Sequence, residues 1–99
     1  METFVGDTIK LILKTGIDLS LYGSLQIMFR RPDGTTGAWD ASLSTDSDEW
    51  MEYTTLETDL DIAGVWALQS HVSDPGIELH GKWTDITVFT PTLEPVIVP

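Results

Sequence analysis

The stretch Asp59-Leu-Asp-Ile-Ala-Gly-Val-Trp-Ala-Leu-Gln69 is the part of the chain that decides the fold prediction. Acidic residues and a glycine open it, and strict alternation begins at Gly64. The two alternating sets are Trp66, Leu68 and Ser70 on one side, and Val65, Ala67 and Gln69 on the other. Side chains of a β-strand point to opposite faces in turn. The stretch therefore predicts a turn that leads into a half-buried strand.

Short alternating segments of the same kind occur along the rest of the chain. The predicted strands are 9–15, 24–30, 36–43, 50–54, 65–73, 77–80 and 83–89, with Ile9, Leu11, Leu13, Leu25, Ile27 and Phe29 facing inward. Turn sequences separate them, notably Arg31-Pro-Asp-Gly34 and Asp74-Pro-Gly76, and we expect a turn with one helical turn at most at 57–63. Gly81 indicates a bulge or bend before the last strand. About seven short strands at this spacing predict an all-β antiparallel sandwich or barrel.

The length and the proline pattern suggest one domain followed by a short arm. Residues 1–90 are enough for one domain with a modest core. Residues 91–99, here called the C-terminal arm, contain three prolines, which exclude a central strand. The arm also contains the apolar, β-prone run Val96-Ile97-Val98. Two alternatives follow: the arm folds back on its own domain as an edge segment, or it docks on a neighbouring copy by strand addition.

The net charge restricts the classes of partner. The formal charge is -11 with a pI near 4.1, and no Lys or Arg occurs between Arg31 and Lys82. This composition argues against nucleic acid and against anionic membrane surfaces as partners. The uneven charge suits either solubility or head-to-tail contacts between copies. With no cysteine, no signal-peptide pattern in residues 1–7 and no long apolar run, we expect synthesis in a cytoplasm.

The two histidines are the first candidates for site chemistry. His71 and His80 flank the turn at residues 74–76, and with Asp74 or Glu78 they would make a sparse metal site. Either the two imidazoles approach each other across the strands, or they face different sides. Their spacing matches no established zinc pattern. The ordinary interpretation is paired surface histidines, so no metal is expected.

Other candidate sites are incomplete. One acidic loop contains Asp46, Asp48 and Glu49, and another contains Asp59 and Asp61. Neither loop has the full set of calcium ligands. No nucleophile lies beside a plausible base, and no phosphate-binding glycine loop is present. We therefore expect a protein that is not an enzyme and that uses no cofactor.

Four tryptophans in 99 residues is a high number. We predict that Trp39 and Trp66 lie in the core. Trp50 and Trp83 are candidate interface residues, together with Val96, Ile97 and Val98 of the arm. Exposed coplanar tryptophans would instead suggest stacking platforms for sugars.

The order of these motifs resembles that of a family of small bacteriophage proteins. The spacing Asp-x-x-Gly-x-Trp-x-Leu resembles the start of the sixth strand of immunoglobulin-like sandwiches, where the aromatic pins a corner. Taken together, the chain resembles the immunoglobulin-like N-terminal domain of phage baseplate upper proteins. The segments that carry this likeness are 5–8, 18–20, 28–35, 37–41, 52–55, 59–69, 81–83 and 87–89.

The resemblance implies a structural component of a phage virion, in the tail, neck or baseplate. Its implied partners are other virion proteins, with self-association as a further possibility, and no catalytic residue carries over. The proline-rich arm departs from the family pattern. Two alternatives therefore stay open: a capsid decoration protein, and a carbohydrate-binding module on the virion surface.

Overall fold

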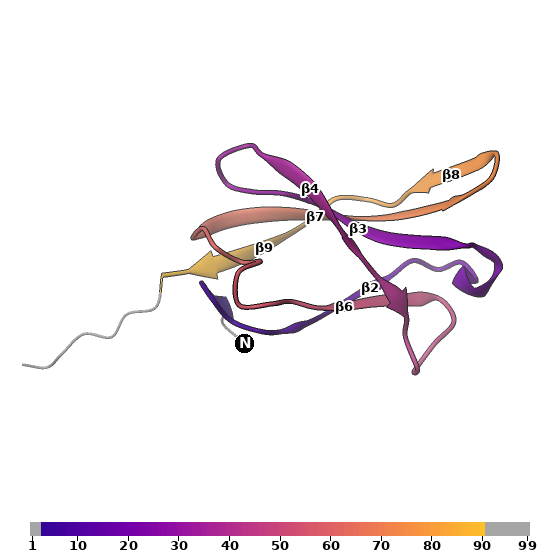
Figure 1. Cartoon of the computed structure of the whole chain (residues 1–99), viewed down its shortest axis with the longest axis horizontal. Coiled ribbons are helices and arrows are strands. Elements are labelled where there is room, and N and C mark those ends of the chain that lie inside the picture. Colours follow the sequence, from indigo (N-terminus) through magenta and orange to yellow (C-terminus); the bar gives the residue numbers. More distant parts are fainter. Residues whose placement is uncertain (1–2, 91–99) are drawn as a thin grey trace, which may run out of the picture.

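The computed structural model describes residues 3–90, which form two sheets packed face to face (Figure 1). The larger sheet has the order β1-β9-β7-β3-β4, and β8 pairs with the second half of β7. The smaller sheet has the order β2-β6-β5. The elements are β1 Thr3–Phe4, β2 Lys10–Lys14, η1 Leu19–Leu21, β3 Ser24–Arg30, β4 Thr36–Asp40, β5 Ser42–Leu43, β6 Trp50–Thr54, β7 Gly64–Asp74, β8 Ile77–His80 and β9 Thr84–Phe89. This arrangement is an immunoglobulin-like β-sandwich, as the sequence predicts.

Strand β7 is the central strand of the larger sheet. It pairs with β3 on one side and with β9 and then β8 on the other. Trp66 and Leu68 are fully buried and Val65 is exposed, which confirms the predicted alternation. Ala67 alternates with Trp66 and Leu68 and shares the side of the exposed Val65, yet it is buried. Its register partners on β3 and β9 are Arg30 and Asp85, both of which have longer side chains.

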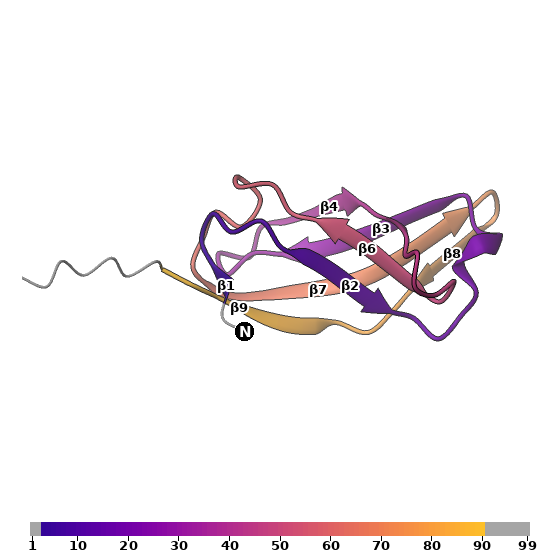
Figure 2. The same cartoon turned by 90° about the horizontal axis from the view of Figure 1, so that it is seen from below.

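The aromatic residue of the corner is held by a hydrogen bond. The indole Nε1 of Trp66 donates to the carbonyl oxygen of Ile62 at 2.8 Å, which ties the strand back to the preceding turn. The tyrosine corner of immunoglobulin-like sandwiches makes a similar bond, from a Tyr hydroxyl to the backbone a few residues upstream. Figure 2 shows this turn joining β6 of the smaller sheet to β7 of the larger one.

The core is a stack of aromatic rings that joins the two sheets. Trp39 lies 4.4 Å from Phe29 and 5.1 Å from Tyr53, measured between ring centroids. Trp66 packs against the same group at 5.7 Å from Phe29. Both predicted core tryptophans, Trp39 and Trp66, are therefore confirmed, and Tyr53 contributes the ring from the smaller sheet.

Three strand predictions, 24–30, 50–54 and 77–80, have the observed bounds, but the single strand predicted at 36–43 is wrong. The chain forms β4 in the larger sheet, bends at Ala41, and forms β5 in the smaller sheet. Strand β4 belongs to the larger sheet and β5 to the smaller one. The alternation of residues along the chain does not show where a strand passes from one sheet to the other. Strand β1 was not predicted; it pairs in parallel with β9. Residues 57–63 form turns without a helix.

The two ends of the sandwich differ. Strand β1 and the end of β9 lie at one end, and the β7–β8 hairpin projects at the other (Figure 1). The predicted C-terminal arm, with Val96, Ile97 and Val98, lies outside the described residues. Residues 3–90 contain no helix of the length and hydropathy needed to cross a bilayer.

Candidate functional site

Among residues 3–90, one edge of β2 in the smaller sheet has no partner strand. Within this range β2 pairs with β6 alone, through bonds such as Thr55 N–H to Ile9 C=O and Thr15 N–H to Glu49 C=O. In an antiparallel pair, the backbone N–H and C=O groups of every second residue bond to the neighbouring strand. The backbone groups of the residues in between point away from that strand. The backbone of Ile12 therefore faces the open side. Unpaired edges of this kind accept an added strand.

An apolar groove of about 760 Å³ runs beside this open edge. We call it the edge groove. Its apolar lining comes from both sheets: Ile12, Leu13 and Ile17 on one side, and Val72 and Leu79 on the other. It thus lies where the two sheets part at the end of the sandwich that carries the hairpin.

The groove exists because β8 extends the larger sheet beyond the part that the smaller sheet covers. Leu79 is the register partner of Val72 and so points to the same side. Val72 is buried, yet Leu79 is 41% exposed and every residue of β8 is exposed. The smaller sheet therefore leaves the β8 part of the apolar face uncovered.

The rim of the edge groove is basic. Lys14 and Lys82 both line it, and they are two of only five Lys and Arg residues in the chain. His80 also lines the groove, while its ring lies beside His71 on the other face of the sheet. On a protein with a net charge of -11, this rim is a suitable place for an acidic or uncharged apolar segment.

The candidate interface residues Trp50 and Trp83 lie on opposite outer faces of the sandwich. Trp50 lies on the outer side of β6, half-buried, with the Lys14 Nζ 4.4 Å from its ring centroid. Trp83 is 44% exposed, and the Arg30 guanidinium lies 5.1 Å from its ring centroid. The two rings do not form one platform for a sugar, and each is already in contact with a cation.

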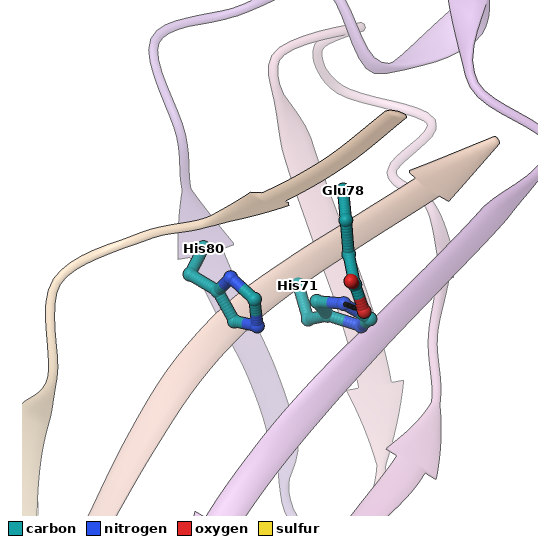
Figure 3. Close-up of side chains that lie close together, drawn as sticks. All are labelled: His71, Glu78 and His80. Atoms are coloured by element: carbon teal, nitrogen blue, oxygen red, sulfur yellow. Dashed lines mark hydrogen bonds and ion pairs between the residues drawn. The ribbon is translucent and has the colours of Figure 1, made fainter. Parts of the chain in front are cut away.

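The histidines lie side by side, so the alternative that they face different sides is wrong. His71 and His80 are register partners on β7 and β8, and their ring centroids are 4.6 Å apart. Figure 3 shows the Glu78 carboxylate beside the His71 ring. Of the two carboxylates considered, Glu78 joins the cluster, at 3.0 Å from His71 Nε2, because β8 places residues 78 and 80 on one face. Asp74 is not part of it.

The acidic loops have structural partners of their own. Asp59 Oδ2 accepts hydrogen bonds from the Tyr53 hydroxyl at 2.6 Å and from the Leu56 N–H at 2.7 Å. Asp61 pairs with Arg31 at 3.4 Å. The Asp46–Glu49 loop is held by serine hydroxyls and a contact with η1, and no group of metal-ligating side chains is found there among residues 3–90.

Comparison with protein-family models and with curated proteins gives no match for this chain. The edge groove was not predicted from the sequence, since it depends on where β8 ends relative to the smaller sheet. The sequence did contain one sign of it. Ile77 and Leu79 alternate with Glu78 and His80, which predicts an apolar face without saying what covers it.

Proposed function

We propose that the chain is a non-enzymatic structural component of a bacteriophage virion, in the tail, neck or baseplate, that assembles through protein–protein contacts. The order of motifs that resembles baseplate upper proteins supports the virion context. The observation that carries the assembly mode is the open edge of β2 beside an apolar groove with a basic rim.

The occupant that fits this site is the C-terminal arm of a second copy. The arm supplies nine residues, with the apolar run Val96-Ile97-Val98 for the groove. Its one charged side chain is Glu94, which complements Lys14 and Lys82 on the rim. Backbone pairing with β2 gives affinity, and alternate apolar side chains entering the groove give specificity. The prolines restrict the free arm to extended conformations, which lowers the entropy lost on docking.

The course of β9 and the position of the groove favour a neighbour over the arm's own domain. Thr84, at the start of β9, lines the edge groove, and β9 then runs away from it to Phe89. Strand β9 therefore ends at the end of the domain opposite the β7–β8 hairpin (Figure 2), and the arm follows it in the sequence. A head-to-tail contact between copies generates rings or filaments rather than a closed dimer. Both are forms that tail, neck and baseplate parts take.

The virion context is tested by detecting the protein in purified particles. Phage that carry this gene with an added epitope tag are purified on a density gradient and imaged with labelled antibody. We expect label at a fixed position on intact particles. Label absent from particles, with the protein left in the soluble lysate fraction, would overturn the proposal. A tagged portal or major capsid protein serves as the positive control.

The assembly mode is tested separately with the arm deleted. Chains lacking residues 91–99 are compared with the full chain in thermal unfolding, in light scattering after size exclusion, and in incorporation into particles. We expect a folded monomer that no longer self-associates or incorporates. A truncated chain that folds and incorporates normally would exclude the arm. A truncated chain with a clearly lower Tm would show that the arm belongs to its own domain.

A further inference from the structure

Four side chains form a polar row across the outer face of the larger sheet. Asp40, Gln26, His71 and His80 are successive register partners on β4, β3, β7 and β8. Gln26 Nε2 donates to Asp40 Oδ1 at 3.4 Å, and Gln26 Oε1 lies 3.3 Å from His71 Nδ1. The row ends at the pair of imidazoles and the Glu78 carboxylate (Figure 3).

The hydrogen-bonding capacity of the neighbouring groups indicates which tautomer of His71 fits this row. The Asp40 carboxylate accepts only, so the NH₂ group of Gln26 faces it and the amide oxygen faces His71. His71 must then donate from Nδ1, which leaves a lone pair on Nε2 in the neutral ring. That nitrogen lies 3.0 Å from Glu78 Oε1, which is also an acceptor. The contact is attractive only when a cation, either a proton or a metal ion, lies between the two atoms.

We propose that His71, His80 and Glu78 form a binding site for a divalent transition metal, with Zn²⁺ as the ion to test. One ligand atom from each residue lies within 4.8 Å of the others. Ligands bound tetrahedrally to zinc lie about 3.4 Å apart, given bonds of about 2.1 Å. Glu78 and His80 are exposed on β8 and can close this difference by rotamer changes, whereas His71 is buried and held in place.

The ligand set indicates which ions fit. Two imidazoles and one carboxylate suit zinc, copper or nickel, while magnesium and calcium prefer oxygen ligands alone. A proton shared by His71 and Glu78 would make no use of His80, which lies beside them. The Asp40–Gln26 pair corresponds to the outer-shell groups that orient metal-bound histidines elsewhere. The fourth position faces solvent, because two of the three ligands are exposed.

A bound ion would fasten β8 to β7. Within the described part of the chain, strand β8 pairs with β7 alone and has no buried residue. Both His80 and Leu79 line the edge groove, so the ion would also fix one wall of that groove. The hydrophobic core contains none of the three ligands, so folding does not depend on the metal.

The experiment is calorimetric titration of the full, chelator-stripped chain with ZnCl₂ in a non-coordinating buffer. We expect saturable 1:1 binding, a rise in Tm with zinc, and no comparable response to Mg²⁺. His80→Ala and Glu78→Gln change exposed positions and leave the core intact. Each should weaken zinc binding by at least about tenfold, and Gln26→Met, which acts only through His71, by about 10–100-fold. Asp74→Asn, on the same hairpin but outside the cluster, is the matched control and should leave affinity unchanged.

Two results would overturn the proposal. The first is zinc binding that is not saturable, or that is matched by Mg²⁺ and lost with added salt. That result would mean weak attraction to the acidic surface. The second is saturable binding that is unchanged in His80→Ala and Glu78→Gln. In either case His71, His80 and Glu78 do not form a metal site, and the cluster is a polar contact beside a surface histidine.

Discussion

The indole N–H of Trp66 donates a 2.8 Å hydrogen bond to the carbonyl of Ile62, four residues earlier in the chain. The bond satisfies the one polar atom of a fully buried side chain. It also fixes the direction in which β7 leaves the turn after β6. The same ring packs against the aromatic core, so one residue joins the turn to the centre of the sandwich.

Two replacements of Trp66 should destabilise the fold by different amounts. We expect Trp66→Phe to lower the free energy of unfolding by about 1–3 kcal/mol, because the Ile62 carbonyl loses its donor. Trp66→Ala should cost about 3–5 kcal/mol through the cavity it leaves. Urea unfolding measures both. Val65→Ala, at the neighbouring exposed position, is the control and should change stability by less than about 1 kcal/mol. Equal midpoints for all three variants would contradict the role of the corner.

Gly37 is required by the ring of its partner residue. Gly37 of β4 is paired with Phe29 of β3, and a Cβ at this position would overlap the Phe29 ring. That ring is buried and stacked on Trp39, so it cannot move aside. We expect Gly37→Ala to cost about 1–3 kcal/mol in urea unfolding, as overpacking does. In a Phe29→Leu background the added cost should shrink. A strictly additive pair would show that the ring is not the cause.

The Tyr53 phenol makes the free energy of unfolding depend on pH in the alkaline range. Burial, and next the hydrogen bond to the Asp59 carboxylate, raise the pKa of Tyr53 from 10.0 to about 12. Between these two values the unfolded chain releases the phenol proton while the folded chain keeps it. The stabilisation is therefore complete below pH 10 and is lost as the pH rises towards 12.

This pH dependence is measured with Tyr53→Phe as the reference. Urea midpoints of the two proteins should differ by a constant amount up to pH 10, and the wild-type midpoint should then fall relative to the variant. Tyrosinate absorbance should show one phenol that titrates late. A constant difference across the whole alkaline range would contradict the raised pKa.

The outward N–H of Ile12 allows a sharp test of strand addition. Proline at position 12 removes that N–H without breaking a bond to β6, a change that edge strands tolerate. We expect Ile12→Pro to leave Tm nearly unchanged and to abolish self-association of the full chain in light scattering. Leu11→Pro, one residue earlier, removes a ladder bond and a core side chain, and should unfold the domain. Normal self-association of Ile12→Pro would exclude pairing at this edge.

The local elements of this fold follow from the sequence because their causes are local. Alternating residues predict β3, β6 and β8 with their observed bounds. Proline and glycine at fixed positions predict the turns at 31–34 and 74–76, where Gly34 and Gly76 adopt positive φ. Trp66 and Trp39 are identified as core by their position within alternating segments.

The remaining features depend on contacts between elements that lie far apart in the chain. The change of sheet at Ala41 and the pairing of β1 with β9 depend on which strands become neighbours. The edge groove depends on how far β8 extends past the smaller sheet. The histidine cluster depends on register, since a shift of one residue would send His80 to the other face from His71. Alternation gives each strand two faces, but only packing determines which face is covered and which residues meet across it.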